Sequence, residues 1–284
     1  MMAKDVKLTR KEAIRYLDIE EKHFDNYHKS SGEIIGVKGE NKRWYFDKKK
    51  LKKWNELKSK RLVELTMKEY TECFEFAIKM AYSIKSRHGT GIRGTRSEMQ
   101  TADDFILGIL AEYGIQKFLK KNYGIEIDLD MVAHPNKITE QDFTGIIEKG
   151  KRRDINIDVA VKSSKWKSCW NVIPPIEYEN KNRRSDIYIF ARVGLPTDHL
   201  FRILRQHSFF KKVSVYLKTN KDKGFRMIEK FDTIPIWICG YSYHKNLRKV
   251  NAIPGQEFSG ERYVASVSEM RNTDNDWKRI IKRF

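Results

Sequence analysis

Cysteine is scarce in this sequence, and its three occurrences are far apart. Cys73, Cys169 and Cys239 are the only cysteines among 284 residues. None belongs to a Cys-x-x-Cys pair or lies near paired histidines, so the pattern favours neither a zinc site nor a disulfide framework. A reducing, cytoplasmic environment is expected.

Long apolar runs are also missing. Residues 1–17 contain no apolar stretch of the length that a signal peptide or a transmembrane helix requires. Low-complexity tracts and internal repeats do not stand out either. These features do not support secretion or membrane insertion.

The charge balance is strongly basic. Lys and Arg number 57 against 38 Asp and Glu, a net charge of +19, while 40% hydrophobic residues are enough for a folded core. A globular chain this basic is expected to meet a polyanion. The lysines are spread along the chain and not gathered on one amphipathic helix, which favours nucleic acid over a membrane surface.

The first sixty residues have the pattern of a small module. Thr9 and Glu12 form a capping box before an apolar stripe, and a second short helix is expected over residues 20–31. Residues 32–46 predict a hairpin, and residues 47–58 predict a third helix with lysines on one side.

This order resembles the winged helix-turn-helix of excisionase-like and MerR-like DNA-binding domains, and we assign it to residues 1–64. The resemblance implies that the second helix enters the major groove and that the hairpin contacts the DNA backbone. The residues expected to contact DNA are His23, Asn26, Tyr27, His28 and Lys29 on the helix, and Lys38, Lys42 and Arg43 on the hairpin.

Residues 65–284 are expected to form an α/β core with a mixed central sheet flanked by helices. Helices are predicted over residues 63–85, 101–124 and 276–284, and strands over 185–194, 213–219 and 233–243. The intervening residues 86–98 predict a loop rich in Gly, Ser, Thr and Arg. Arg93 and Arg96 in this loop are candidates for phosphate contacts.

The chemistry-bearing stretch is residues 141–166. It predicts two strands joined by a basic turn that contains a glycine, and the second strand alternates apolar and polar residues from Asp154 to Lys162. Asp142, Asp158 and Lys162 are thereby candidates for one site. Carboxylates can hold Mg²⁺ and an ammonium can stabilise charge that develops on phosphate, which is what metal-dependent phosphodiester hydrolysis needs.

The stretch resembles the PD-(D/E)XK nuclease superfamily and, within it, type II restriction endonucleases. The resemblance assigns Asp142 as the first metal ligand, the Val161 carbonyl as a further ligand and Lys162 as the catalytic cation. Lys165 lies close to where a scissile phosphate would sit. The restriction-endonuclease-like core is the fold that the resemblance implies.

The second acid departs from the family pattern, because Ala160 stands two residues before Lys162. Three explanations are open: the acid has moved to Asp158, a helix supplies it, or the site is inactive. Glu112, embedded in the apolar pattern of residues 101–124, is the candidate on a helix, because a carboxylate among core neighbours is costly unless it is paired or bound to a cation.

The expected function is Mg²⁺-dependent cleavage of double-stranded DNA at a specific short sequence. The resemblance also implies a homodimer and a companion DNA methyltransferase that acts on the same site. The rival hypotheses are a repair, recombination or transposition nuclease of the same superfamily, an inactive DNA-binding regulator, and, on charge alone, an RNA-binding protein.

Overall fold

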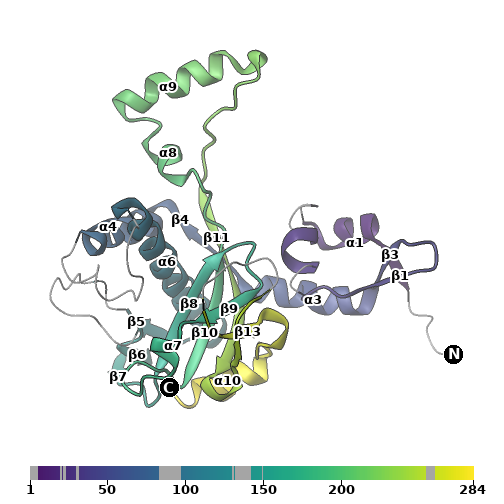
Figure 1. The fold of residues 1–284 in the computed structure, drawn as a ribbon, viewed down its shortest axis with the longest axis vertical. Coiled ribbons are helices and arrows are strands. Elements are labelled where there is room, and N and C mark those ends of the chain that lie inside the picture. The colour runs from purple at the N-terminus through teal and green to yellow at the C-terminus, as the bar shows by residue number, and fades with distance from the viewer. Residues whose placement is uncertain are drawn as a thin grey trace.

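The computed structural model of the chain is a mixed α/β protein (Figure 1). It describes residues 6–19, 21, 24–29, 32–82, 97–129, 131, 142–148, 150–253 and 260–284. Within these ranges the strands form one four-stranded sheet and three sheets of three strands. None of the helices described is long and apolar enough to cross a lipid bilayer. The expected α/β class is confirmed.

The N-terminal segments form a small unit of helices and a three-stranded sheet, at the right of Figure 1. In chain order the elements are β1 (Lys7–Thr9), α1 (Arg10–Leu17), the short helical segment η1 (Phe24–Lys29), β2 (Gly36–Lys38), β3 (Trp44–Asp47) and α3 (Lys48–Arg61). Thr9 and Glu12 form the predicted capping box. The predicted order of elements is confirmed, and the winged helix-turn-helix assignment stays a prediction.

The central sheet has the strand order β4-β11-β10-β8. Its strands are β4 (Leu62–Thr66), β8 (Val159–Lys165), β10 (Ile187–Val193) and β11 (Thr233–Tyr243). Strand β10 is parallel to β8 and antiparallel to β11. All seven residues of β10 are buried, as expected for an apolar strand covered on both faces. The strands predicted around β10 and β11 are confirmed.

Two long helices cover one face of this sheet. They are α4 (Met67–Ala81) and α6 (Glu98–Tyr123), and α6 packs against β8, β10 and β11. Helix α6 ends at Gly124, whose φ of 69° is left-handed, so the predicted C-terminal stop is confirmed. A β-carbon at Gly114 would lie 2.6 Å from a methyl carbon of Ile236. The helix and the sheet therefore approach each other closely at this point.

The other face of the sheet packs against the N-terminal unit. Phe190 of β10 and Trp237 of β11 belong to the same buried cluster as Phe46 and Leu51 of that unit. The Trp54 ring of α3 stacks on the Trp237 ring, with centroids 5.4 Å apart. Helix α3 also runs directly into β4, so the predicted domain boundary after residue 64 falls inside a strand of the central sheet.

Short elements complete the core. One small sheet contains β5 (Glu126–Asp128), β6 (Gly145–Glu148) and β7 (Lys151–Arg153), and another contains β9 (Trp170–Ile173), β12 (Arg248–Val250) and β13 (Arg262–Ser266). The helical elements are α7 (Pro175–Tyr178), η3 (His244–Asn246), η4 (Val267–Glu269) and α10 (Asp274–Ile281). Helix α10 confirms the helix predicted near the end of the sequence.

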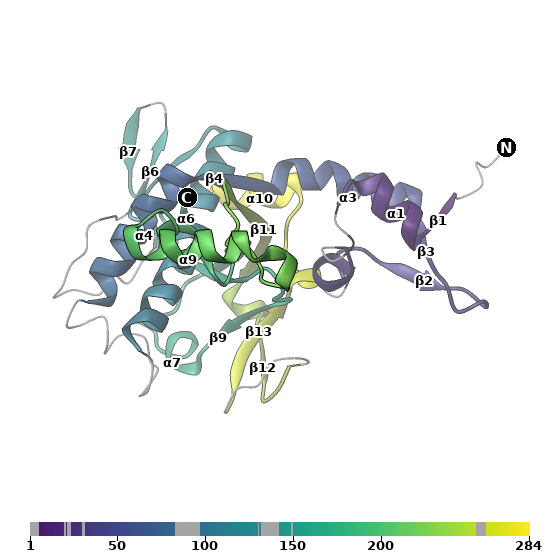
Figure 2. The same cartoon turned by 90° about the horizontal axis from the view of Figure 1, so that it is seen from above.

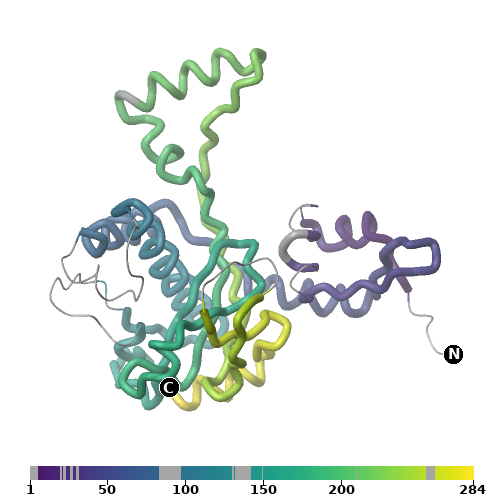
Figure 3. The backbone as a smooth tube through the Cα atoms, viewed as in Figure 1, coloured from purple at the N-terminus to yellow at the C-terminus, as the bar shows by residue number. Residues whose placement is uncertain are grey.

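A helical arm projects from the core between β10 and β11 (Figures 1 and 3). It contains α8 (His199–Leu204), α9 (Ser208–Thr219) and η2 (Lys221–Lys223). The strand predicted over residues 213–219 is therefore wrong. Val215 and Tyr216 are 58% and 55% exposed, so the apolar alternation of this segment does not mark a buried strand.

A second correction concerns residues 63–66, which were predicted to open a long helix. They belong to β4, where Val63 and Leu65 are buried and Leu65 pairs with Ile234. Helix α4 begins only after Thr66, whose side chain forms a capping box with Glu69. The capping box marks the helix start in the sequence, whereas the apolar spacing alone extends the helix back to residue 63.

The hairpin predicted around residues 141–166 is also different from the expected one. Strand β6 pairs with β7, and Gly150 lies in the turn between them with a φ of 76°. Strand β8 belongs to the central sheet and pairs with β10. The residues around Asp142 and Lys162 are therefore not on paired strands, although they still meet in space.

Candidate active site

The candidate site lies at the open edge of the central sheet. Strand β8 is the last strand in the sheet order. The Val161 N–H of this strand donates to Asp142 Oδ2 at 2.6 Å. The N–H and C=O of one strand residue point to the same side of the strand, so the Val161 carbonyl also faces the side on which Asp142 lies.

Asp142 precedes β6 and is partly buried. Burial raises the pKa of its carboxyl group. The Lys162 ammonium and the Val161 N–H act in the opposite direction, while the negative charge of Glu177 adds to the effect of burial, and the net pKa is raised. Asp142 is therefore brought within electrostatic reach of Lys162, as the sequence predicts.

Lys162 has a carboxylate partner that the sequence analysis did not identify. Its Nζ lies 2.8 Å from Glu177 Oε1, and the two side chains are 27% and 21% exposed. Burial lowers the pKa of Lys162, but Glu177 and Asp142 outweigh it and the net pKa is raised. We call Asp142, Lys162 and Glu177 the Lys162 cluster.

Glu177 is held in place by the residue that follows it. The Tyr178 ring stacks on His244 and on Tyr263, with centroid distances of 3.8 and 3.6 Å. The Tyr178 hydroxyl donates to the His244 carbonyl at 3.1 Å, and His244 Nε2 lies 2.9 Å from the Tyr178 carbonyl. These contacts fix the single turn of α7 and with it the position of Glu177.

A sequence signal for this acid exists. Pro175 is at the first turn of α7 and Glu177 is the acid of that turn. Proline at the start and an acid in the first turn are typical of a helix N-terminus. Glu177 lies outside the stretch of residues 141–166 in which the sequence analysis places the site, and it is not among the predicted site residues.

Glu112 and Asp158 have different relations to this cluster. Burial lowers the pKa of Lys162, and the charges of Glu177 and Asp142 raise it by more. The charge of Glu112 also raises this pKa, as a smaller contribution. Asp158 is exposed just before β8, and its carbonyl accepts from the Asp186 N–H at 2.9 Å. Four residues of strand separate it from Lys162, about 13 Å. Glu177 is therefore closer to Lys162 than Asp158 is, and the role of Asp158 as a metal ligand stays a prediction.

The donors of the Lys162 cluster fit a magnesium ion. Among the residues that the structure describes, no group of three or more His, Cys, Asp and Glu side chains could hold a metal. Mg²⁺ needs fewer protein ligands, because it usually keeps several waters and binds one or two carboxylates together with substrate phosphate. Asp142 and Glu177 each supply a carboxylate near Lys162, and the Val161 carbonyl faces the side of Asp142, so all three are hard oxygen donors.

The predicted DNA contacts on the hairpin are accessible. Lys38, Lys42 and Arg43 are exposed on the hairpin of β2 and β3, which extends away from the central sheet (Figure 2). The turn is closed by two hydrogen bonds, from the Gly39 N–H to the Arg43 carbonyl at 2.8 Å and from the Lys42 N–H to the Gly39 carbonyl at 2.9 Å. Their contact with DNA stays a prediction.

The predicted DNA contacts on the second helix that the structure describes are less accessible than those on the hairpin. His28 is only 3% exposed, its ring lies against Trp54 and Trp237, and its Nδ1 lies 3.1 Å from Glu33 Oε2. The prediction that His28 faces DNA is wrong, because the ring is buried where the N-terminal unit meets the sheet. Lys29 is partly exposed above the Trp44 ring, with its Nζ 4.1 Å from the centroid.

Several predicted contacts fall outside the described residues. They are His23, Arg93 and Arg96, together with the side chains of Asn26 and Tyr27. Lys165 is described: it is half exposed, and its Nζ lies 3.5 Å from Asp103 Oδ2. The other oxygen of Asp103 lies 2.7 Å from Nε2 of the buried His199. Lys165 is thus tied to helix α6, and its contact with DNA stays a prediction.

Comparison of the chain with protein-family models, with curated proteins and with solved structures found no match.

Proposed function

We propose that the protein is a Mg²⁺-dependent endonuclease that cleaves double-stranded DNA at a specific short sequence, as a type II restriction enzyme does. The observation that carries this proposal is the Lys162 cluster. Two carboxylates and an ammonium lie together at the open edge of a sheet, next to a main-chain carbonyl. This is the set of groups that hydrolysis of a phosphodiester requires.

Asp142 and Glu177 would hold the ion, with the Val161 carbonyl as a further ligand. A bound Mg²⁺ polarises the phosphate and lowers the pKa of a coordinated water. Asp142 has a raised pKa because of burial, with the charge of Glu177 adding to it. A cation between the two carboxylates would remove this repulsion and favour the ionised form of both.

Lys162 acts as a cation in this proposal. Burial lowers its pKa, but Glu177 and Asp142 raise it above the ordinary value, so the side chain stays protonated at neutral pH. A protonated lysine can donate hydrogen bonds to the scissile phosphate and to the attacking water, and it stabilises the charge that accumulates in the transition state. It cannot act as the general base in that state.

The DNA partner is supported by charge and by exposed cations. The net charge of +19 favours a polyanion, and Lys38, Lys42 and Arg43 stand on an accessible hairpin. The proposed homodimer and the companion methyltransferase follow from the family resemblance. A repair, recombination or transposition nuclease of the same superfamily would use the same cluster.

A DNA-binding regulator without activity is the second candidate. It is favoured by one observation: Ala160 stands where the family has an acid, and this residue of β8 is buried. Under this hypothesis the ion pair of Lys162 and Glu177 is only structural.

Digestion of a plasmid and of mixed linear DNA, with Mg²⁺ or with EDTA, tests the proposal. Discrete fragments that form only with Mg²⁺ are expected. Cutting confined to junctions or free ends would favour a repair nuclease. Binding without cleavage under every divalent metal would favour the regulator.

A further inference from the structure

A cavity of about 540 Å³ lies at the end of β11, away from the Lys162 cluster. Three chain segments line it: the residues before β10, the residues from the end of β11 into η3, and the residues after α10. The lining residues are Arg184, Ser185, Asp186, Tyr243, His244, Lys245 and Arg283.

The lining is rich in positive charge that has no carboxylate partner. Among the described residues, Arg184, Lys245 and Arg283 form no ion pair, and Arg283 lies over the Tyr243 ring at 6.0 Å. Among the described residues that line the cavity, Asp186 is the one acid, and its Oδ2 accepts from the Asp158 N–H at 3.2 Å. The three cations outnumber this acid in the described lining, so the cavity carries a net positive charge that favours an anion.

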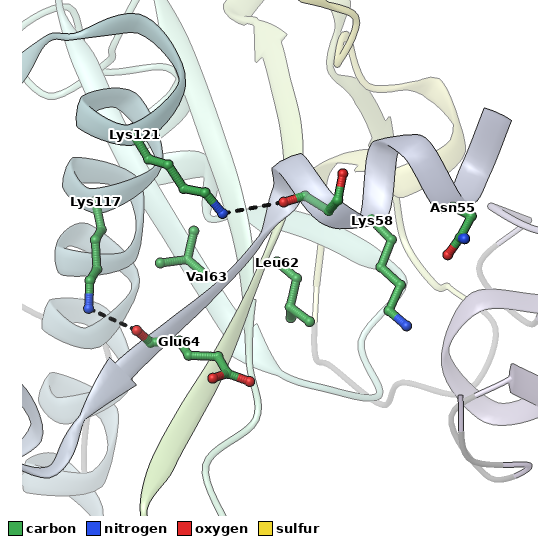
Figure 4. A pocket seen from close by; sticks show the side chains of 8 residues that line it. Asn55, Lys58, Leu62, Val63, Glu64, Lys117 and Lys121 are labelled. Carbon is green, nitrogen blue, oxygen red and sulfur yellow. Dashed lines mark hydrogen bonds between the residues drawn. The ribbon is translucent and has the colours of Figure 1, made fainter. Parts of the chain in front are cut away.

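The pocket shown in Figure 4 gives the contrast. It is lined by Lys58, Lys117 and Lys121, but the chain itself engages each ammonium. Lys58 lies 3.1 Å from the Leu17 carbonyl, Lys117 lies 2.9 Å from the Glu64 carbonyl, and Lys121 lies 3.4 Å from the Ser59 carbonyl. Those lysines tie helices α3 and α6 to their neighbours, whereas the cations around Arg184 are left for another partner.

We propose that the cavity formed by Arg184, Lys245 and Arg283, with the hydroxyl groups of Ser185 and Tyr243, binds a phosphate group. We call it the Arg184 pocket. Guanidinium groups match the geometry of phosphate oxygens, and an ammonium and hydroxyl groups add further donors. A backbone phosphate of the duplex is the source of the group, an assignment that rests on the proposed function.

The position of the pocket relative to the cluster supports this source. His244 of the pocket stacks on Tyr178, the residue next to Glu177. Tyr243 pairs with Ile187 and Lys162 pairs with Phe190, so the two residues lie on opposite sides of β10, three residues apart along it. The offset is about 10 Å along the strand and about 10 Å across it, a separation that a DNA strand spans within a few nucleotides. The pocket would hold a phosphate that flanks the scissile one.

Binding of a labelled DNA duplex in EDTA, measured over a range of salt concentrations, tests the proposal. The test variant combines Arg184→Gln, Lys245→Gln and Arg283→Gln. The control combines Lys68→Gln, Lys79→Gln and Lys181→Gln, which removes the same charge from exposed positions outside the pocket. We expect the test variant to bind about tenfold more weakly and its salt dependence to be shallower by about 0.9 in log–log slope. The control should change both quantities much less.

A second measurement separates the possible sources of the phosphate. Inorganic phosphate should raise the melting temperature of the wild type and of the control more than that of the test variant. If only this shift is seen and duplex binding is equal in both variants, the pocket takes free phosphate. If the shift is seen and the wild type does not bind DNA, the proposed function fails and the pocket stands. Equal behaviour of the test variant and the control in both measurements overturns the pocket.

Discussion

The acid that completes the candidate site comes from a position that the strand pattern does not reach. A strand presents alternate residues on one face, so the pattern leads from Lys162 back to Ala160 and Asp158. The structure brings Glu177 instead, 2.8 Å from the lysine. Asp142 and Lys162 are predicted from the strand alternation and the family resemblance, and the structure brings them within electrostatic reach of each other. Glu177 could not be assigned from spacing, because its position depends on how Tyr178 packs against His244 and Tyr263.

Substitution of each candidate acid in turn tests whether Glu177 or Asp158 is the second acid of the site. Glu177→Gln should lower the rate of Mg²⁺-dependent cleavage by at least about a hundredfold, because it removes a proposed metal ligand and the partner of Lys162. Asp158→Asn, the matched control, should keep the rate within about threefold, since its side chain is exposed before β8. The rates are compared under single-turnover conditions. A loss of activity with Asp158→Asn alone would return the second acid to Asp158.

At the scale of elements, hydrophobic periodicity and helix-capping residues predict most of the secondary structure. Helix α6 and strands β10 and β11 are long and strongly patterned, and their predictions are confirmed. The errors lie where a short apolar run fits two periods. Residues 62–66 pair with β11, and α9 projects from the core with apolar side chains exposed. Packing against distant parts of the chain determines the secondary structure of such segments, and a single sequence does not show which parts pack together.

Two glycines of α6 should respond in opposite ways to alanine. A β-carbon at Gly108 would have no heavy atom within 4 Å, whereas one at Gly114 would meet Ile236 at 2.6 Å. Gly108→Ala should therefore raise the free energy of unfolding by about 0.5–1 kcal/mol. Gly114→Ala should lower it by about 1–3 kcal/mol, because the helix must move away from β11. Urea denaturation measures both. Equal effects of the two substitutions would contradict the close packing of α6 on the sheet.

At the scale of the whole molecule, a buried charge cluster joins the N-terminal unit to the central sheet. The side chain of Glu33 is 5% exposed and pairs with Arg192, which is fully buried in β10. Glu33 also accepts from Trp237 Nε1 at 2.8 Å. The sequence did not predict this junction, because its partners are far apart in the chain. His28 faces the core because its ring contacts Glu33 in this junction.

The Glu33 junction makes stability depend on pH. Burial alone would raise the pKa of Glu33, but Arg192, His28 and Arg61 outweigh it and lower the pKa to about 2. A lowered pKa contributes stability above the ordinary value of 4.5, and this contribution is lost as pH falls from about 4.5 towards 2. A shift of this size corresponds to about 3 kcal/mol. Glu33 should contribute a loss of this size to the wild type across that interval.

Glu33→Gln tests the junction directly. At pH 7 it should lower the free energy of unfolding by about 3–5 kcal/mol, because Arg61 and Arg192 stay buried without their anion. Its stability should also fall less steeply than that of the wild type below pH 4.5. Glu40→Gln, an exposed acid on the hairpin, is the control and should change neither. Equal urea midpoints for Glu33→Gln and Glu40→Gln would show that the two parts are not held together in this way.

The central claim is that Asp142, Lys162 and Glu177 act together on a phosphodiester. The most direct measurement is the single-turnover rate of plasmid cleavage with Mg²⁺ by Lys162→Ala, at protein concentrations that saturate DNA binding. The wild type should cut the plasmid, and Lys162→Ala should bind it with similar affinity and cut it at least about a hundredfold more slowly. If the Lys162→Ala variant cleaved the plasmid at the rate of the wild type, the claim would be contradicted.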